Sequence, residues 1–276
     1  MKRLIIRPGA MGDFIVSIPA LECLRTEYVE IWTAAQNVPL AARLAQRARS
    51  ITATGLDLLE LTGASAALLE MLRSFDSIVS WYGTQRAEFR DAVAALGLPF
   101  RFFPALPAEG CGSHAADYYL GQVRSIAPCV SDGIPRIECP AVRGKCAVIH
   151  PFSGGVRKRW PLDRFQALAQ RLEREMPVEW CAGPEEELRS AHRFADLFEL
   201  ACWLASARVY IGNDSGPTHL AAAVGTPVVA LFGPSNPAVW APRGPHVRIA
   251  AAAALEQITV GQVESLVQDV LISARV

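Results

Sequence analysis

Short runs rich in β-branched residues alternate with stretches of helical periodicity along the whole chain. In the first half the strand-like runs are residues 3–7, 29–33, 76–81 and 98–103, and in the second half they are 146–150, 178–182, 208–212, 227–232 and 247–250. Segments between them, such as 165–175 and 185–198, carry apolar residues at helical spacing. This alternation is typical of right-handed βαβ units. The sequence therefore predicts an α/β protein with parallel sheets.

A chain of 276 residues is long enough for two domains that each close their own core. The stretch 127–144 is rich in Pro, Gly and Cys without a clear period, which predicts a linker. We therefore expect two Rossmann-like domains facing each other across a cleft, at residues 1–135 and 136–276. The final segment, 260–273, is predicted to be an amphipathic helix, and its packing back on the first domain is left open.

Charge and hydropathy argue against several classes of protein. Lys plus Arg equals Asp plus Glu at 27 each, and each half of the chain is close to neutral, so nucleic acid is not an expected partner. No segment approaches the roughly 18 unbroken apolar residues of a membrane span. Arg7 and Asp13 interrupt the apolar start too early for a signal peptide.

The seven cysteines show neither a C-x-x-C motif nor Cys/His pairs at zinc spacing. Cys146 and Cys181 lie in strand-like runs, which favours a role as small core residues. Seven is also an odd number for a disulfide framework. We therefore expect a reducing, cytoplasmic environment.

A first loop of chemical interest follows the strand-like run 3–7. Its sequence, Arg-Pro-Gly-Ala-Met-Gly-Asp, matches neither G-x-G-x-x-G nor G-x-x-x-x-G-K-[ST]. Asp13 is expected in the first turn of a helix, where the helix dipole favours the ionised carboxylate. Such a carboxylate can accept a proton from a hydroxyl nucleophile. The alternative is that it only stabilises the helix, as first-turn acidic residues usually do.

A second loop, residues 150–161, follows the strand-like run 146–150. It combines Ser153, the pair Gly154-Gly155 and the cationic run 157–159. Exposed backbone N–H groups and concentrated positive charge suit a diphosphate and can neutralise it without a metal. A charge run is more often a solvated surface loop. The adjacent Ser-Gly-Gly and the position after a strand favour phosphate binding here.

A third loop, residues 214–219, has the sequence Asp-Ser-Gly-Pro-Thr-His and joins a strand-like run to an alanine-rich helical run. Ligands of open α/β sheets lie beyond the carboxyl ends of strands, and a helix N-terminus directs N–H groups at anions. Asp214 and Ser215 are suited to sugar hydroxyls. The alternative is an ordinary helix cap followed by a packed His219. Two more segments lie at strand ends. Residues 182–187 offer a carboxylate suited to ribose hydroxyls, and residues 231–237 are expected to form the floor or rim of the cleft.

The motifs at 8–13, 150–161 and 213–220 together resemble those of glycosyltransferase family 9, which contains the ADP-heptose:lipopolysaccharide heptosyltransferases. Their order and spacing run the length of the chain. The resemblance implies a GT-B fold and an inverting, metal-independent enzyme without a cofactor. It implies transfer of a sugar, in this family a heptose from ADP-heptose, to a lipopolysaccharide core or another glycan acceptor.

The resemblance also implies roles for individual residues. Asp13 matches the catalytic base of the family. The donor diphosphate is expected at Ser153, Gly154, Lys158 and His219, the donor sugar at Asp214, Ser215 and Gly216, and the ribose at Glu185, with no metal ligands.

The first half of the chain departs from the family pattern. The chain is shorter than typical members, and its first half lacks a dense basic cluster for a phosphorylated or Kdo-bearing lipid. The local candidates, Arg43, Arg47 and Arg49, or Arg86 and Arg90, are equally explained by solvation on helix surfaces. Two alternative functions stay open: a nucleotide-sugar epimerase of GT-B type and a non-catalytic nucleotide-sugar-binding protein. A glycolipid acceptor would imply peripheral contact with the cytoplasmic face of the inner membrane, and the oligomeric state is not defined by the sequence.

Overall fold

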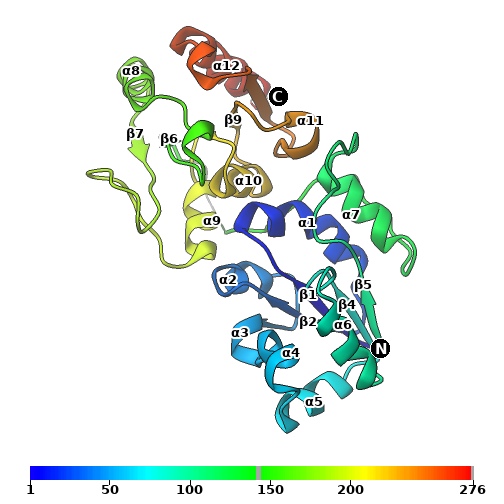
Figure 1. Cartoon of the computed structure of the whole chain (residues 1–276). Helices are drawn as coiled ribbons and strands as arrows, with labels where there is room; N and C mark the ends of the chain where they lie inside the picture. Colours follow the sequence, from blue (N-terminus) through cyan, green and yellow to red (C-terminus); the bar gives the residue numbers. More distant parts are fainter. Residues whose placement is uncertain (141–143, 275–276) are drawn as a thin grey trace. The chain divides into compact units, whose positions relative to one another are not determined.

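The computed structural model describes residues 1–140 and 144–274 and divides the chain into two compact units (Figure 1). Unit 1 comprises residues 1–111 and 115–132, and unit 2 comprises residues 112–114 and the chain from 133 onward. The change from one unit to the other at 132/133 falls inside the compositional linker, of which residues 141–143 lie outside the described part.

Unit 1 is built on a five-stranded parallel sheet with the strand order β3-β2-β1-β4-β5. The strands are β1 (Lys2–Arg7), β2 (Tyr28–Thr33), β3 (Arg47–Ser50), β4 (Ser77–Ser80) and β5 (Phe100–Phe102). The helices are α1 (Met11–Cys23), α2 (Val38–Ala41), α3 (Ile51–Thr54), α4 (Leu59–Thr62), α5 (Ala66–Arg73), α6 (Ala87–Ala95) and α7 (Ala115–Val123), with short 3-10 turns at Ala35–Asn37 and Leu56–Leu58.

The core of unit 1 follows from the twofold alternation of side chains along its strands. Leu4 and Ile6 of β1 enter one apolar cluster with Leu59 of α4, Leu72 of α5 and Phe89 of α6. Helix α1 packs beside α7 (Figure 1). β1 is buried from its second residue onward, as expected of a parallel strand with both faces covered.

Unit 2 repeats this architecture with the strand order β10-β9-β8-β6-β7, again all parallel. The strands are β6 (Ala147–His150), β7 (Val178–Trp180), β8 (Val209–Asn213), β9 (Val228–Phe232) and β10 (Val247–Ala251). The helices are α8 (Leu162–Leu172), α9 (Leu197–Ala205), α10 (Gly216–Ala223), α11 (Pro237–Trp240) and α12 (Val260–Ser273), with 3-10 turns at Val156–Lys158 and Leu255–Gln257.

Helix α12 packs within unit 2, against α8, β9 and β10. Its residues Val263 and Val267 join a core cluster with Phe165 of α8. The helix begins with a capping box: Gln262 N–H donates to Thr259 Oγ1 over 3.3 Å, and Thr259 N–H donates to Gln262 Oε1 over 2.8 Å. The apolar stripe predicted for 260–273 thus covers the sheet of the same unit.

The predicted α/β class with parallel sheets is confirmed, and each of the nine predicted strand-like runs contains a strand. The helix predicted over 185–198 is wrong for most of its length, because α9 begins only at Leu197. The preceding segment is held in an irregular course by Arg193, whose Nη2 donates to the carbonyls of Glu186 and Leu188 at 2.7 and 3.0 Å. Asp196 then caps α9 by accepting from two of its first N–H groups.

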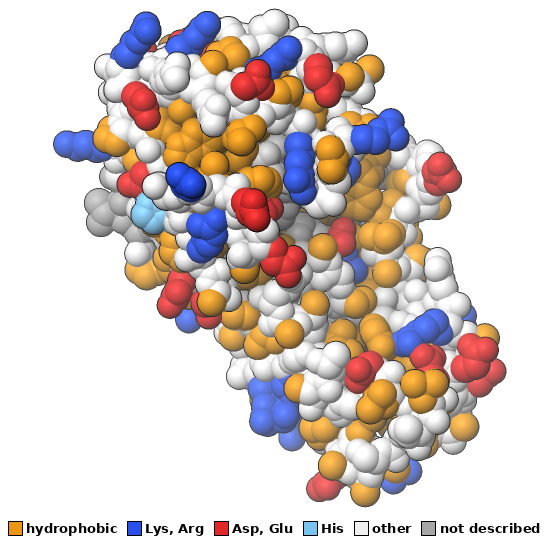
Figure 2. Space-filling view, turned by 60° about the vertical axis from the view of Figure 1, so that its left-hand side comes forward, with side chains coloured by type: hydrophobic (Ala, Val, Ile, Leu, Met, Phe, Trp, Pro, Cys, Tyr) orange, Lys and Arg blue, Asp and Glu red, His pale blue; other side chains and the backbone are white. Residues whose placement is uncertain are grey.

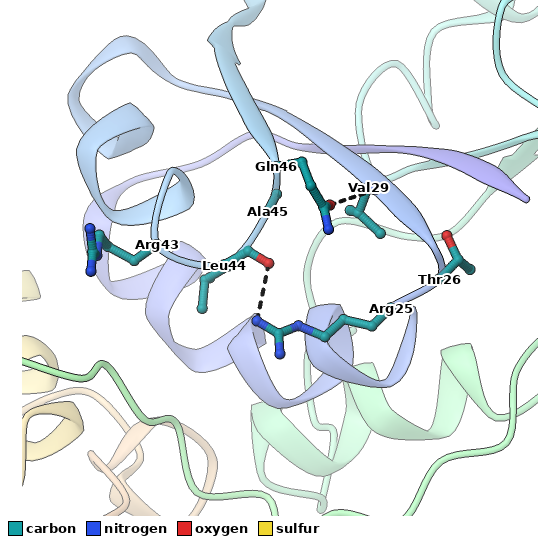
Figure 3. A pocket seen from close by; sticks show the side chains of 7 residues that line it. All are labelled: Arg25, Thr26, Val29, Arg43, Leu44, Ala45 and Gln46. Atoms are coloured by element: carbon teal, nitrogen blue, oxygen red, sulfur yellow. Dashed lines mark hydrogen bonds between the residues drawn. The ribbon is translucent and has the colours of Figure 1, made fainter.

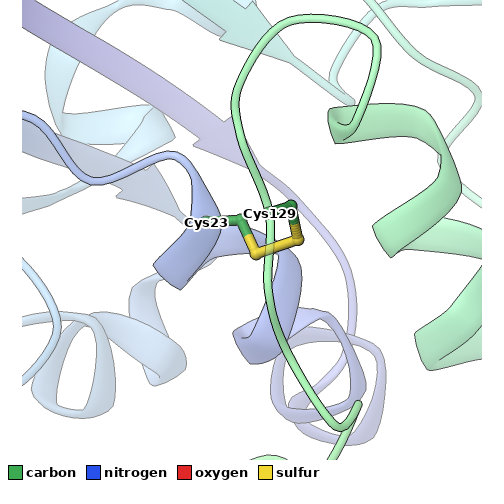
Figure 4. The surroundings of a disulfide bond; sticks show 2 residues. All are labelled: Cys23 and Cys129. Atoms are coloured by element: carbon green, nitrogen blue, oxygen red, sulfur yellow. A yellow bond between two sulfur atoms is a disulfide. The ribbon is translucent and has the colours of Figure 1, made fainter.

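A disulfide links Cys23, the last residue of α1, to Cys129, which follows α7 (Figure 4). This bond contradicts the expectation, drawn from the odd number of cysteines, that the cysteines are reduced, because an odd count still allows one pair to form. The Cα atoms lie 5.0 Å apart although 106 residues separate them. Of the two cysteines predicted to be core residues, Cys181 is buried and Cys146 is half-buried. Burial raises the pKa of the Cys181 thiol to about 12.

Charges of both signs are interspersed on the face of the molecule seen in Figure 2, in keeping with the balanced composition. Within residues 1–140 and 144–274, the helices are too short or too polar for any of them to cross a bilayer.

Candidate functional site

The three loops singled out in the sequence follow strands at the points where the strand order reverses. In unit 1, β1 lies between β2 and β4, and in unit 2, β6 lies between β7 and β8. Such switch points leave a crevice beyond the carboxyl ends of the strands, where ligands of open α/β sheets bind. The Asp13 loop follows β1, and the other two loops follow the adjacent strands β6 and β8.

Asp13 is the third residue of α1, as the sequence predicted. Its Oδ2 accepts a hydrogen bond from the backbone N–H of Ala10 at 3.3 Å. Gly9 has a φ of +114°, and a Cβ there would lie 3.2 Å from the same oxygen. Glycine is therefore required for the loop to pass this close to the carboxylate. The side chain of Asp13 is half-buried, so the carboxylate retains access to solvent.

Arg7, the last residue of β1, is buried and fixes this turn. Its guanidinium donates to the carbonyl of Asp13 at 2.9 Å, to Ser17 Oγ at 3.0 Å and to the carbonyl of Ala105 at 3.2 Å. It also lies 4.5 Å from the ring centroid of Tyr119, a distance suited to a cation–π contact. Burial raises the pKa of the Tyr119 hydroxyl. No sequence pattern indicated this role for Arg7.

Asp214 is the point at which three loops of unit 2 meet. Its Oδ2 accepts from Lys158 Nζ at 2.8 Å and from Ser235 Oγ at 2.6 Å. His219 Nε2 lies 4.0 Å from the other carboxylate oxygen. The structure thus brings together the second and third predicted loops, and adds the loop that follows β9.

The loop after β6 is also tied to the end of β8 by buried hydrogen bonds. Ser153 Oγ donates to the carbonyl of Asp214 at 3.1 Å. Asn213, which is fully buried, donates through Nδ2 to the carbonyl of Pro151 at 2.8 Å and accepts at Oδ1 from the N–H of Trp160 at 2.9 Å. These bonds fix the cationic loop relative to the N-terminus of α10.

The N-terminus of α10 lies directly beside Asp214. Ser215 is the N-cap residue in an extended conformation, and Gly216 is the first helical residue. Thr218 Oγ1 donates to the carbonyl of Asn213 at 2.5 Å and lies 3.2 Å from Ser215 Oγ. Gly154 of the neighbouring loop is exposed, and a Cβ there would meet no atom within 4 Å. First-turn N–H groups and an open glycine loop form the surroundings that an anion requires.

Glu185 and Glu186, which follow β7, differ sharply in environment. Glu185 is exposed, whereas Glu186 Oε2 accepts from Gly183 N–H at 2.6 Å and from His150 Nε2 at 3.1 Å. Burial alone would raise the pKa of the Glu186 carboxyl, but the hydrogen bonds from His150 and Gly183 outweigh it and lower that pKa. Glu186 is therefore the acidic side chain that the fold holds at this strand end.

Several of these residues were not singled out by the sequence. Ser235 lies in a strand-end loop that was interpreted only as a rim, and Asn213 and His150 appeared only as motif members. The one available signal was their position directly after a strand. The loop contacts that give them a role depend on the tertiary fold.

The arginines considered as acceptor-binding candidates do not form one cluster beside Asp13. Arg43 lines a hollow of about 390 Å³ with Arg25 at the amino ends of β2 and β3, the opposite edge of the sheet (Figure 3). Arg49 pairs with Glu30 at 2.6 Å. Arg86 pairs with Glu60. Arg47 and Arg90 are exposed.

Among the described residues, no group of three or more His, Cys, Asp or Glu side chains is arranged to hold a metal ion.

The fold is shared with solved glycosyltransferase structures. Escherichia coli ADP-heptose lipopolysaccharide heptosyltransferase II is 17% identical, with all of both chains covered and a TM-score of 0.75. The iron-containing dodecameric glycosyltransferase TibC of enterotoxigenic E. coli H10407 is 15% identical over 99% of this chain and 79% of that chain, with a TM-score of 0.63. The two parallel-sheet units therefore belong to the GT-B fold class.

The sequence defines the family within that class. A family model described as glycosyltransferase family 9 (heptosyltransferase) matches residues 127–267, about half of the chain. Lipopolysaccharide heptosyltransferase 3 of E. coli (strain K12) is 29% identical over 147 residues, and the match covers 46% of this chain and 42% of that protein. The match thus spans less than half the length of this relative. The chain belongs to glycosyltransferase family 9, and the resemblance seen in its motifs is confirmed.

Proposed function

We propose that the protein is an inverting glycosyltransferase that moves a sugar from a nucleotide-diphosphate donor to a hydroxyl group of a glycan acceptor. The observation that supports the proposal most is the geometry at Asp214, which accepts hydrogen bonds from Lys158 and Ser235 and directly precedes the N-terminus of α10. The chain also belongs to a glycosyltransferase family. ADP-heptose is the first candidate donor, because the solved relative named above is an ADP-heptose enzyme.

In this proposal, unit 2 binds the donor. Lys158, the Ser153-Gly154 loop, His219 and the first-turn N–H groups of α10 neutralise the charge that grows on the departing diphosphate. Asp214, Ser215 and Gly216 contact the donor sugar. The negative charge of Asp214 also favours the oxocarbenium-like character of the anomeric carbon as its bond to the diphosphate breaks.

The ribose contact was assigned to Glu185 from the motif register. We propose that Glu186 or Glu185 contacts the ribose, with Glu186 favoured because its carboxylate is fixed by Gly183 and His150. An ionised, oriented carboxylate suits the paired hydroxyls of a ribose.

Asp13 acts as the base in this scheme. The acceptor hydroxyl attacks the anomeric carbon from the side opposite the diphosphate, its proton passes to Asp13, and the diphosphate leaves with the bonding electrons. No step requires a metal ion, because cationic and N–H groups already oppose the diphosphate charge. Turnover that is unchanged after chelation with EDTA would support this point, and loss of turnover restored by iron would contradict it.

A glycan acceptor in a lipopolysaccharide core would place the protein in the cytoplasm, in peripheral contact with the inner membrane. Flotation with vesicles of lipopolysaccharide-containing lipid tests this part of the proposal, and recovery of all protein in the lipid-free fraction would contradict it.

A panel of ADP-, UDP-, GDP- and dTDP-sugars, screened by thermal shift and then by product analysis, tests the donor. We expect one nucleotide class to raise the melting temperature. Consumption of that donor without any acceptor, giving an isomerised sugar, would identify an epimerase instead. Binding without turnover across acceptors would indicate a non-catalytic nucleotide-sugar-binding protein.

Asp13→Ala tests the base. We expect turnover to fall by about 10² to 10⁴-fold, because a positioned base contributes this much, while the donor Kd stays unchanged. Turnover of Asp13→Asn, which keeps a hydrogen-bond acceptor for Ala10 N–H, should fall by the same factor. Unchanged turnover in both variants would remove Asp13 from the mechanism.

A further inference from the structure

A pocket of about 460 Å³ opens at the carboxyl edge of the unit 1 sheet. Its walls come from Pro8 after β1, from the turn after β4, from the loop after β5 and from Tyr118 of α7. The volume lies in the range typical of small-molecule sites. From the sequence, Arg86 was the only residue of the turn after β4 considered for acceptor binding.

This pocket adjoins Asp13 through a short chain of contacts within unit 1. The carbonyl of Ala105, in the pocket wall, accepts from Arg7 Nη1 at 3.2 Å. The same guanidinium holds the carbonyl of Asp13 through Nη2 at 2.9 Å. Pro8, which also lines the pocket, directly precedes Gly9, where an added Cβ would lie 3.2 Å from Asp13 Oδ2. A ligand in the pocket would therefore lie beside the turn that carries the proposed base.

The side chains that line the pocket combine aromatic rings with neutral polar groups. Tyr82 and Tyr118 contribute half-buried rings, and Thr84 and Gln85 contribute a hydroxyl and an amide. A pyranose ring presents the same combination, with apolar C–H faces that pack on aromatic rings and hydroxyls around its edge.

The charge that lines the pocket is paired with a carboxylate outside the lining. Arg86 is the single charged side chain among the described residues that line it, and its guanidinium pairs with the Glu60 carboxylate. The guanidinium also lies 4.6 Å from the ring centroid of Tyr82 and 5.1 Å from that of Phe89. A phosphate or carboxylate on a ligand would meet a guanidinium whose charge is already paired with Glu60. The free-energy cost of removing that anionic group from water would therefore not be offset by a new ion pair.

We propose that this pocket binds the acceptor sugar, and that this sugar is a neutral glycoside rather than a phosphorylated or acidic one. The inference rests on the proposed function and specifies its acceptor class. Neutral glycosides occur in glycolipids, polysaccharides and glycoproteins alike, and all three present the same ring to the pocket.

Saturation-transfer NMR on the full chain tests the sugar class. The neutral probes are the methyl glycosides of glucose, galactose and mannose, and the acidic probes are methyl glucuronoside, methyl galacturonoside and mannose 6-phosphate. We expect signals from at least one neutral probe and weaker signals from its acidic counterpart. Signals from acidic probes alone, or from no probe, would overturn the proposal.

Variants locate the binding. Tyr82→Ala and Tyr118→Ala should each weaken binding of the neutral probe by about tenfold, which corresponds to about 1.4 kcal/mol of binding free energy. Arg25→Ala, in the hollow at the other edge of the sheet, is the matched control and should leave the signal unchanged. Equal effects in all three variants, or none in either tyrosine variant, would overturn the location.

Glu60→Gln tests the charge argument. The amide keeps a hydrogen-bond acceptor for Arg86 but leaves the guanidinium charge uncompensated. Binding of the acidic probes should rise severalfold relative to the neutral ones, and an unchanged ratio would contradict the assigned role of the Glu60–Arg86 pair.

Donor binding separates the two proposals. Absence of any nucleotide-sugar thermal shift would remove the proposed function, whatever the glycosides do. A normal donor shift combined with transfer only to acidic acceptors would leave the function standing and remove this inference.

Discussion

The Asp214 carboxylate is mostly buried, while the Lys158 side chain that donates to it is far more exposed. The Asp214 side chain is 10% exposed, whereas that of Lys158 is 42% exposed. An ammonium group carries three donors on a flexible stem, so Lys158 can turn part of its hydrogen bonding to a diphosphate while it stays near Asp214. Ser235 keeps the same carboxylate oxygen in place. The site is therefore held together before a ligand arrives.

Lys158→Ala should weaken donor binding by at least about tenfold, because the variant removes a charge-assisted contact to the diphosphate. Calorimetric titration with ADP and with the donor measures this. Arg157→Ala is the matched control, since it removes the same charge from an exposed position in the same loop. Equal losses in the two variants would mean that the loop acts through its overall charge and not through Lys158.

At the level of single residues, sequence context located the ligand loops but could not resolve their contacts. Asp13 was singled out as a first-turn residue of a helix that follows a strand, and Asp214 as a residue between a strand and a helix, and both lie there. Ser235 reaches Asp214 across 21 residues, a contact that no local pattern encodes. The choice between Glu185 and Glu186 depends on one residue of register in an irregular loop.

At the level of elements, Asn213 is the last residue of β8 and clamps the loop that follows β6. Asn213→Ala would leave the Pro151 carbonyl and the Trp160 N–H buried without partners, at a cost of about 1–3 kcal/mol each. We expect a loss of about 2–6 kcal/mol in the free energy of unfolding of unit 2, together with weaker donor binding. Denaturant titration followed by hydrogen exchange of unit 2 peptides measures both.

Asn236→Ala serves as the control for that prediction. The Asn236 side chain only caps the short helix α11, through the N–H of Ala238, so its loss should cost about 1 kcal/mol. If the two asparagine variants were equally stable, the hydrogen bonds of Asn213 would not be what holds the loop after β6 in place.

Strand β3 shows why some elements escaped prediction. Its sequence, Arg-Ala-Arg-Ser, has little β propensity. It forms a strand because it pairs with β2, where Glu30 lies opposite Arg47 and also binds Arg49 at 2.6 Å. The helical periodicity of 185–196 failed for the reverse reason, since Arg193 and a bridge between Cys181 and His192 hold that segment in another course. Both outcomes are decided by tertiary partners.

At the scale of the whole molecule, the alternation of strand-like and helical runs was sufficient to predict two parallel α/β units. Each unit needs only buried apolar strands and amphipathic helices, and both signals are local. The pairing of Cys23 with Cys129 is not local, because it joins the end of α1 to a segment 106 residues away.

Loss of that disulfide should destabilise unit 1 and spare unit 2. Closing a loop of this length removes about 4–5 kcal/mol of chain entropy from the unfolded state in the chain-entropy model. The double substitution Cys23→Ser and Cys129→Ser, or addition of dithiothreitol, should therefore speed hydrogen exchange in unit 1 peptides only. Cys202→Ser in unit 2 is the matched control. Exchange in unit 1 that is indifferent to reductant would contradict the prediction.

The same bond closes residues 23–129 into a covalent ring that contains every strand and helix of unit 1 after α1. A protease that cuts once inside this ring severs the backbone without releasing a fragment. On a gel run without reductant the nicked protein would migrate as one band, and reduction would resolve it into two.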